Sequence, residues 1–316
     1  MVDEPREPRW DEERRAALAA RRAERRSQIR RRRIAALLSL VGVIAGVVVV
    51  VAVASSGSGS GSGSGGKTKG EIEGGRGKVR NSTPQAGWAP HTGPVPILEY
   101  HVLGEPPEGE AYPELFVTRP DFRHQLEWLD ENGYEAVTLE QVEDAWYRGG
   151  TLPKQPVVLS FDDGYRPQFT FALPQLRKHG WAGLLDLKAE GSDLYESNVE
   201  AMIAAGWELA AHTIHHLDLT ELGPAELEEE VTGSREMLER EFHVPVNDFC
   251  YPAGRFDRTV IEAVEAAGYE GATTEIPGYA EKDKPFELAR FEILRSTGVS
   301  GLAEDLRTGE GATAEL

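Results

Sequence analysis

The chain has 316 residues, of which 40% are hydrophobic and 8% aromatic, enough apolar sequence to build one large or two modest domains. Its net charge of −19 argues against nucleic acid as a main partner. The single cysteine, Cys250, excludes an internal disulfide and any zinc or iron–sulfur site that needs several cysteines.

The positive charge is concentrated at the N-terminus. Residues 1–33 hold twelve arginines and seven acidic residues, a balance of +5, so the rest of the chain carries −24. Four consecutive arginines end this basic segment, and the uncharged residues 34–54 follow, with Ser39 as their one polar side chain. A helix of about 20 apolar residues spans a bilayer, and flanking arginines stay on the cytoplasmic side. We therefore predict a single-pass cell-membrane protein with a cytoplasmic N-terminus and an extracytoplasmic remainder.

A cleaved signal peptide is the alternative interpretation of this segment. The apolar region of a signal peptide is normally about 7 to 15 residues long, which favours the anchor, although Ala52 and Ala54 have the spacing of a cleavage site. Residues 55–93 are rich in glycine, serine and other polar residues, and we interpret them as a flexible linker. Some 40 residues of flexible chain have a root-mean-square reach of about 35 Å.

Residues 94–316 alternate short apolar runs with amphipathic segments, the pattern of strands joined by helical crossovers. Strands are expected at 95–100, 156–161, 181–187, 207–211, 248–251 and 269–274. Helices are expected at 119–132, 171–179, 198–205, 224–242 and 258–267. Repeated strand–helix units over about 220 residues predict one α/β domain, a barrel of the (β/α) type, whose active site lies where the strands end.

Two adjacent carboxylates follow the apolar run at 156–161. They belong to the sequence Ser-Phe-Asp-Asp-Gly, residues 160–164, in which the final glycine permits a tight turn. Neighbouring side chains at a strand end diverge, so Asp163 can bind a cation while Asp162 reaches a water on that cation. A solvated Asp-Asp-Gly turn is the alternative interpretation.

Three histidines follow the strand expected at 207–211, in residues 212–216 (His-Thr-Ile-His-His). His212 and His216, four residues apart, fall on one face of a helical turn and suit zinc, with His215 as a competing ligand. A surface histidine cluster is the alternative. Together with Asp163, the two imidazoles supply one oxygen and two nitrogens, the ligand set of an open catalytic zinc site.

A third cluster, residues 249–254 (Phe-Cys-Tyr-Pro-Ala-Gly), ends another strand with turn residues whose backbone N–H groups could face a developing oxyanion. As a bare pattern this signal is weak. Cys250 is interpreted as a small buried residue because no neighbouring residue is specified as its base.

These residues resemble the polysaccharide deacetylase family, also called the NodB-homology or carbohydrate esterase family 4 domain. Residues 160–164 are similar to its motif (T/S)FDDG and residues 212–216 to its motif H(S/T)xxH, and the likeness extends over about residues 94–299. The resemblance implies a distorted (β/α) barrel of seven or eight strands. It also implies Asp162 as general base, a metal held by Asp163, His212 and His216, and the backbone N–H of Tyr251 as oxyanion donor.

The chain departs from the family pattern at two points. The third motif lacks the arginine that orients the base, and Arg255 comes too late to match it. No histidine follows His243, so the usual C-terminal acid is missing. His101 ends the first predicted strand in a Tyr-His pair similar to that of the poly-N-acetylglucosamine deacetylase branch, whose motif order is permuted. We therefore predict His101 as the general acid; a histidine bonded to backbone is the alternative.

The family resemblance implies a metal-dependent hydrolase that removes N-acetyl groups from N-acetylglucosamine-containing polysaccharide, either exopolysaccharide or peptidoglycan, outside the membrane. The ligand types favour Zn²⁺, and Co²⁺ or Ni²⁺ also fit. Acetylated xylan is a lesser alternative substrate. A non-catalytic carbohydrate-binding protein and a hydrolase of a non-sugar amide on the same fold are the competing functions.

Overall fold

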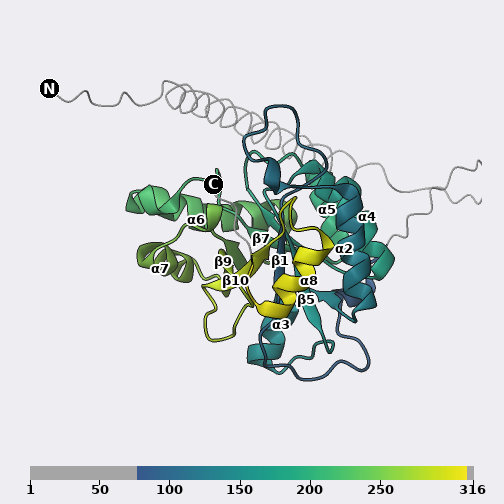
Figure 1. The fold of residues 1–316 in the computed structure, drawn as a ribbon. Helices are drawn as coiled ribbons and strands as arrows, with labels where there is room; N and C mark the ends of the chain where they lie inside the picture. Colours follow the sequence, from purple (N-terminus) through teal and green to yellow (C-terminus); the bar gives the residue numbers. More distant parts are fainter. Residues whose placement is uncertain (1–76, 312–316) are drawn as a thin grey trace, which may run out of the picture. The chain divides into compact units, whose positions relative to one another are not determined.

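A closed ring of seven parallel strands forms the centre of the domain. The computed structural model describes residues 77–311 (Figure 1). The strands are β1 (Ile97–Tyr100), β5 (Pro156–Asp162), β6 (Leu184–Leu187), β7 (Glu208–Ala211), β8 (Asp248–Cys250), β9 (Gly271–Pro277) and β10 (Leu288–Glu292). They pair in the order β1-β10-β9-β8-β7-β6-β5, and β1 pairs with β5 to close the ring. The predicted α/β barrel is confirmed, with seven strands in the ring.

An eighth strand of the same sheet, β4 (Glu135–Val137), pairs with the N-terminal half of β5 outside the ring. A separate two-stranded sheet is formed by β2 (Val102–Leu103) and β3 (Phe116–Val117) after the end of β1.

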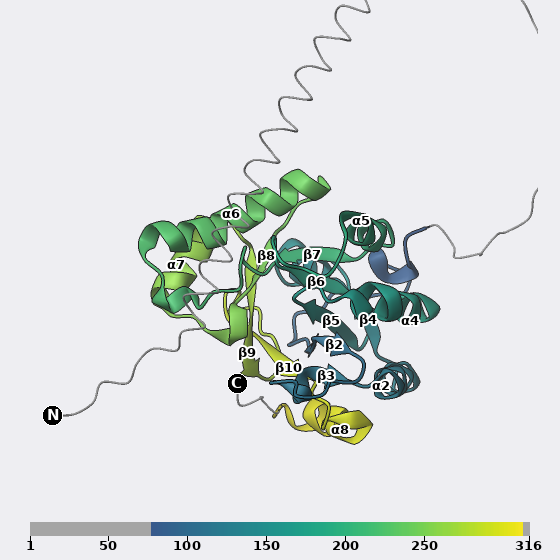
Figure 2. The same ribbon diagram turned by 90° about the horizontal axis from the view of Figure 1, so that it is seen from above.

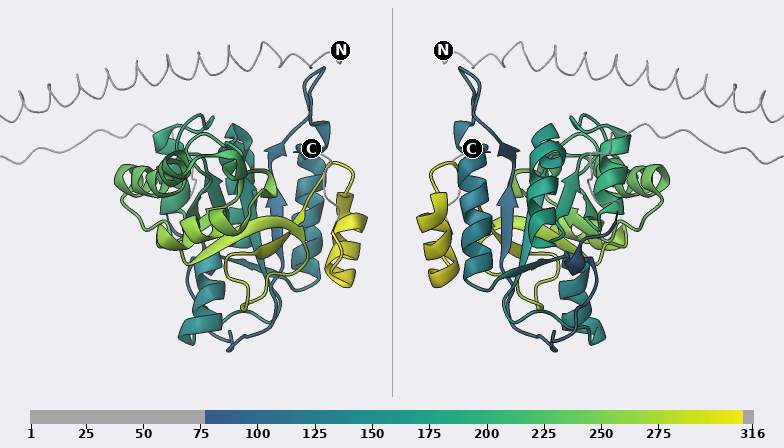
Figure 3. Two further views of the ribbon diagram at one scale, coloured as in Figure 1. Left: turned by 90° about the vertical axis from the view of Figure 1, so that its left-hand side faces the viewer. Right: turned by 90° about the vertical axis from the view of Figure 1, so that its right-hand side faces the viewer.

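Helices surround the strands, as the view from above shows (Figure 2). The α-helices are α2 (Arg119–Glu131), α3 (Leu139–Glu143), α4 (Leu173–His179), α5 (Glu196–Ala204), α6 (Pro224–Phe242), α7 (Arg258–Ala266) and α8 (Gly298–Thr308). The short 3-10 and π segments are η1 (Arg80–Ser82), η2 (Pro113–Leu115), η3 (Asp144–Arg148), η4 (Gln168–Ala172), η5 (Leu219–Glu221) and η6 (Pro252–Gly254). The last helix, α8, packs beside α2 (Figure 3).

Local sequence explains where several helices begin and end. The Thr118 side chain caps α2 by accepting the N–H of Asp121 at 3.1 Å, and Asp257 caps α7 by accepting the N–H of Val260 at 2.9 Å. Helix α4 ends at Gly180, whose φ of 76° is the left-handed conformation that glycine adopts without strain.

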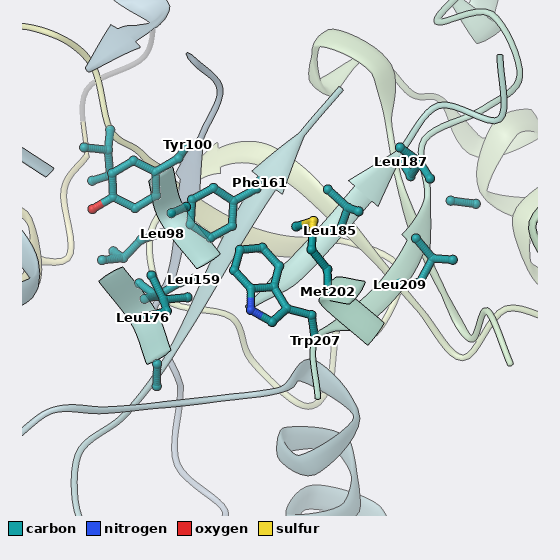
Figure 4. Close-up of a cluster of buried hydrophobic side chains, with 14 of the residues drawn as sticks. Leu98, Tyr100, Leu159, Phe161, Leu176, Leu185, Leu187, Met202, Trp207 and Leu209 are labelled. Carbon is teal, nitrogen blue, oxygen red and sulfur yellow. The ribbon is translucent and has the colours of Figure 1, made fainter. Parts of the chain in front are cut away.

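The two faces of each strand have different roles, because successive side chains of a strand point in opposite directions. From β5, Leu159 and Phe161 face the helices, where Phe161 stacks on Tyr100 with ring centroids 5.6 Å apart and contacts Trp207 at 5.0 Å (Figure 4). The alternate residues Ser160 and Asp162 contact Arg290 instead. A second apolar cluster, which includes Val158 and residues of α3, fills the N-terminal part of the barrel. Polar side chains are therefore buried above an apolar layer.

The predicted linker is too long at its C-terminal end. It was expected to reach residue 93, but Val79 donates its N–H to Ala205 O at 2.8 Å, and Asn81 donates its N–H to Gly180 O at 2.8 Å. Both side chains are buried against the domain. The folded part therefore includes residues 77–93, because a few buried side chains anchor a segment whose average composition is polar.

The basic segment at 1–33, the membrane span at 34–54 and the linker up to residue 76 lie outside the described residues. Within residues 77–311, no helix has both the length and the apolar character needed to cross a membrane.

Candidate active site

The aspartate and histidine motifs meet at the C-terminal ends of the strands, the face that carries active sites in α/β barrels. Asp163 Oδ1 lies 3.9 Å from His212 Nε2 and 3.8 Å from His216 Nε2. These three residues form a group whose candidate ligand atoms all lie within 4.8 Å of one another. The structure thus brings together the three residues that the sequence predicts as metal ligands.

The backbone is strained where these ligands sit. Asp163 has φ of 73° and His216 φ of 59°, values that residues with a Cβ seldom adopt. Gly164 follows with φ of 74°, and a Cβ there would lie 2.4 Å from Ser192 Oγ and 2.5 Å from Leu187 Cδ1. The glycine of the Asp-Asp-Gly sequence is therefore required for both its conformation and its packing.

The His212 ring is oriented for ligation. Its Nδ1 lies 2.9 Å from Cys250 O, and because a carbonyl can only accept, Nδ1 carries the proton. Burial, together with the neighbouring His216, lowers the pKa of His212 to about 4, so the ring is neutral at pH 7. The lone pair of a neutral ring protonated at Nδ1 is on Nε2, the atom that faces Asp163.

The other two ligands are also in the charge state that a metal needs. Burial lowers the pKa of His216. Burial alone would raise the pKa of Asp163, but the neighbouring His212, Lys188 and His216 outweigh it, and the pKa is lowered. One carboxylate oxygen and two neutral imidazole nitrogens fit a divalent transition metal such as Zn²⁺.

His215, considered as a competing ligand, points away from this group. Its Nδ1 lies 2.5 Å from Glu230 Oε1, and its backbone N–H is donated to Glu230 Oε2 at 2.9 Å. The Ile214 N–H is donated to the same oxygen at 3.0 Å. Glu230 thus holds the histidine loop in place, and His215 belongs to that support.

Asp162 is bound by an arginine that sequence analysis did not identify. Arg290 from β10 donates from Nη1 to Asp162 Oδ1 at 2.9 Å and from Nη2 to Oδ2 at 3.0 Å, a bidentate pair. Burial would raise the pKa of Asp162, but the charges around it, the guanidinium first, lower it below its usual range. The aspartate is therefore ionised at neutral pH, as a general base must be.

Arg290 occupies the place of the arginine missing from the third motif. It comes from β10, for which no strand was predicted, although Arg290 and Glu292 alternate with apolar residues as in a half-exposed strand. In the barrel both are buried, at 1% and 3% exposure. Arg255, judged too late to match, forms a surface ion pair with Asp218 at 2.8 Å.

Arg290 also contacts two further buried carboxyl groups. Glu99 Oε2 lies 3.1 Å from Nη2, and Asp186 Oδ2 lies 3.6 Å from Nη1. Burial raises the pKa of each, and the Arg290 charge only partly opposes that increase. The pKa of Asp162 is therefore lowered beside this guanidinium, whereas burial raises the pKa values of Glu99 and Asp186.

The predicted acid, His101, directly follows β1, between β5 and β10 in the ring. Its Nε2 lies 3.7 Å from Glu99 Oε1, and it belongs to a group with Glu99 and Glu292. Gln168 Nε2 donates to the backbone oxygens of His101 at 3.0 Å and of Asp162 at 2.6 Å, which ties the two strand ends together. His101 keeps a partly exposed side chain at the same end of the barrel as Asp162.

The Tyr251 N–H, predicted as the oxyanion donor, takes part in strand pairing in this structure. It is donated to Thr273 O of β9 at 3.2 Å, because Tyr251 still follows the pairing of β8 with β9. The turn begins two residues later, at Ala253 with φ of 49°. The Ala253 N–H lies in this turn and is a second candidate donor to a ligand.

Cys250 is fully buried, and its Sγ lies 3.4 Å from Asp162 Oδ2. Burial raises the pKa of the thiol, so it is a neutral neighbour of the base, in agreement with the interpretation of a small buried residue.

Comparison with known proteins identifies the family. The polysaccharide deacetylase family matches residues 149–272. A Bacillus subtilis (strain 168) protein named "Putative polysaccharide deacetylase YxkH" is 30% identical over 213 residues, which cover 66% of this chain and 74% of that protein. The chain belongs to the polysaccharide deacetylase family.

Other members of the family extend this similarity. The poly-beta-1,6-N-acetyl-D-glucosamine N-deacetylase of Escherichia coli (strain K12) is 39% identical over 94 residues, 29% of this chain and 13% of that protein. The Streptococcus pyogenes deacetylase PplD, solved in complex with acetate, aligns with a TM-score of 0.63 and 25% identity over 70% of this chain and 100% of that chain. IcaB from Ammonifex degensii aligns with a TM-score of 0.56 and 22% identity over 67% and 97%, and supports the fold alone.

Proposed function

We propose that this polysaccharide deacetylase family member is a metal-dependent N-deacetylase of N-acetylglucosamine-containing polysaccharide. One observation carries the proposal: an ionised Asp162, held at both oxygens by Arg290, adjoins Asp163, whose Oδ1 faces two imidazoles. A base beside a ligand set of this kind suits hydrolysis of an amide.

Asp163, His212 and His216 would hold the metal. A divalent ion in such a site polarises a carbonyl and lowers the pKa of a bound water. His212 Nδ1–H, donated to Cys250 O, keeps the ring turned so that Nε2 faces the site. His215 holds the loop through Glu230 and takes no part in ligation.

Asp162 accepts the proton of the attacking water. Each of its oxygens accepts one guanidinium N–H and has a further lone pair for that proton. The carbonyl carbon gains the oxygen, and its own oxygen becomes an oxyanion that needs a positioned donor. We assign this donor to the Ala253 N–H in place of that of Tyr251, because the Tyr251 N–H is bound to Thr273 O.

His101 protonates the leaving amine. The C–N bond then breaks, acetate is released, and a glucosamine unit remains. The Glu99 and Glu292 side chains beside His101 orient the ring. The missing C-terminal histidine is thus replaced from the first strand of the same ring, next to β10.

The substrate assignment is supported by the similarity to the E. coli poly-beta-1,6-N-acetyl-D-glucosamine N-deacetylase. The test is acetate release by the purified full chain from a β-1,6-linked N-acetylglucosamine oligomer and, in parallel, from peptidoglycan glycan strands. Faster release from the oligomer supports an exopolysaccharide substrate, and faster release from the strands supports peptidoglycan. Release from neither, but from a non-sugar acetamide, would contradict the proposal.

A catalytically inactive carbohydrate-binding protein is the second candidate. The absence of the third-motif arginine and of the C-terminal histidine motivates this candidate. Arg290 weakens the first reason, because it makes a bidentate contact to Asp162. Binding of the oligomer with a full metal complement and no acetate release would favour this candidate.

We further propose that the catalytic domain lies outside the membrane, anchored by residues 34–54. The basic segment in front of this apolar stretch supports that orientation. Protease added to intact cells should remove the domain while a tag at the N-terminus stays protected; a protected domain would contradict the orientation.

A further inference from the structure

A lysine lies against the carboxylate of the candidate metal site. Lys188 directly follows β6, and its Nζ lies 3.0 Å from Asp163 Oδ1. This is the same oxygen that faces His212 Nε2 at 3.9 Å and His216 Nε2 at 3.8 Å. The ammonium and the two imidazoles therefore converge on one carboxylate oxygen.

The Lys188 ammonium and a divalent ion would both bind Asp163 Oδ1, and their positive charges repel each other. An ion held by Asp163, His212 and His216 would take Asp163 Oδ1 as its one anionic ligand. The ammonium, 3.0 Å from that oxygen, would then lie within a few ångströms of a second, doubly charged cation. Both side chains of the ion pair are mostly buried, at 19% exposure for Lys188 and 9% for Asp163, so water screens this repulsion weakly.

The Tyr165 ring provides the ammonium with a second contact. Lys188 Nζ lies 5.8 Å from the centroid of the Tyr165 ring, within the range of a cation–π contact. The four-carbon stem of lysine is flexible, so the ammonium can leave Asp163 and remain at this ring. The backbone beneath is fixed, because Gly164 O accepts both the Asp193 N–H at 3.1 Å and the Ser192 hydroxyl at 3.0 Å.

We propose that Lys188 is an internal competitor for the metal site. Its ammonium neutralises Asp163 in the metal-free protein and leaves Oδ1 when a divalent ion binds. Two consequences follow: Lys188 stabilises the metal-free fold, and it weakens metal binding. Lys188 acts here as a positioning residue, and this role rests on the metal site of the proposed function.

The test measures zinc affinity of the full chain by competition with a chromophoric chelator, after metal removal. Lys188→Met keeps the length of the side chain and removes the charge. We expect it to bind Zn²⁺ about tenfold more tightly, since the partly buried pair it removes is stronger than an exposed one. Lys178→Met is the matched control, because Lys178 contacts Gln175 on the exposed surface of α4, and its affinity should equal that of wild type.

Thermal unfolding supplies a second measurement. Metal-free Lys188→Met should melt below metal-free wild type, and the gain in melting temperature on adding Zn²⁺ should be larger in the variant. Lys188→Gln, neutral and polar, repeats both measurements if the methionine variant does not fold. Lys188→Arg, which keeps the charge, should stay close to wild type in affinity.

Equal or weaker zinc affinity in both neutral variants would overturn the competitor role. Zinc binding by none of the proteins, wild type included, would instead contradict the metal site of the proposed function. The two failures are distinguishable because the first requires wild type to bind zinc.

Discussion

Within residues 77–311, carboxyl groups are buried at both ends of the barrel, and a buried cation, Arg290, accompanies those at the C-terminal end. At the C-terminal end, Glu99, Asp162 and Asp186 surround Arg290, which is 1% exposed. At the N-terminal end, Glu143 of α3 adjoins Asp248 at the start of β8. A Cβ on Gly271 would lie 2.7 Å from Glu143 Oε1 and 2.8 Å from Asp248 Oδ1, so only glycine leaves room for both.

The cation nearest to this N-terminal pair lies at the surface. Arg148 Nη2 is 3.9 Å from Glu143 Oε2, and the Arg148 side chain is 42% exposed. Burial, with the nearby carboxylates, raises the pKa of Glu143 to about 9. Burial also raises the pKa of Asp248, to about 7. At the other end the pKa of Asp162 is lowered.

A neighbouring buried cation, and not burial itself, makes a buried carboxyl group a base. Burial alone favours the protonated form at both ends. A bidentate guanidinium reverses the balance for Asp162, so the barrel holds an ionised carboxylate where a proton must be accepted. The N-terminal carboxyl groups, without a buried cation, can share protons and contribute to packing.

The largest effect is expected from substituting the proposed metal ligands, which lie at the C-terminal end of the barrel. His212→Ala removes the Nε2 that faces Asp163, and should abolish both metal binding and acetate release. His215→Gln is the matched control within the same motif, because His215 faces Glu230. Metal content by atomic emission and acetate release check both variants. Full metal occupancy in His212→Ala would show that the ion binds elsewhere.

Substitutions of Arg290 and Arg148 test the role of the buried cation. Arg290→Gln should lower turnover by about 10² or more, since Asp162 loses the charge that keeps it ionised. Its pKa should rise, so the acidic limb of the pH–rate profile should move to higher pH. Stability should fall by about 3–5 kcal/mol, the usual cost of removing one partner of a buried pair. Arg148→Gln, at the other end, should leave turnover and profile unchanged. An unshifted acidic limb in Arg290→Gln would exclude Arg290 as the group that holds the base.

Stability against pH tests the N-terminal end. Because the folded-state pKa values of Asp248 and Glu143 lie above the ordinary values of 3.8 and 4.5, their contribution to stability is full below about pH 4. It is lost as pH rises toward the folded values of about 7 and about 9. The free energy of unfolding should therefore decrease across this range, and less steeply in Asp248→Asn. Glu262→Gln, on the exposed surface of α7, is the control and should keep the wild-type slope. Equal slopes in all three proteins would show that Asp248 is not protonated in the fold.

Sequence patterns predicted the parts of the site that are close in the chain. Asp162 and Asp163 are adjacent, and His212 and His216 are four residues apart in the loop after β7, not on the expected helical turn. Strand-end position and ligand chemistry were nevertheless enough to group them. Helix α6 (Pro224–Phe242) has the limits predicted from its apolar spacing.

The features that were missed depend on contacts between distant segments. Arg290 reaches Asp162 across 128 positions in sequence, and its strand has the polar alternation of an exposed strand because the barrel interior there is polar. The family resemblance placed the oxyanion donor at Tyr251, whereas in the structure that N–H is donated to Thr273 O of β9. The predicted C-terminal boundary of the linker, residue 93, was wrong because the burial of Val79 and Asn81 depends on the folded domain.

The most direct test of the account is acetate release and metal content measured together for the full-length wild type and Asp162→Asn. The account predicts about one divalent metal per chain in both proteins, with acetate release from an N-acetylglucosamine oligomer reduced by about 10² to 10⁴ in the variant. Acetate release at the wild-type rate by Asp162→Asn, with its metal in place, would contradict the assignment of Asp162 as the base on which the proposed mechanism depends.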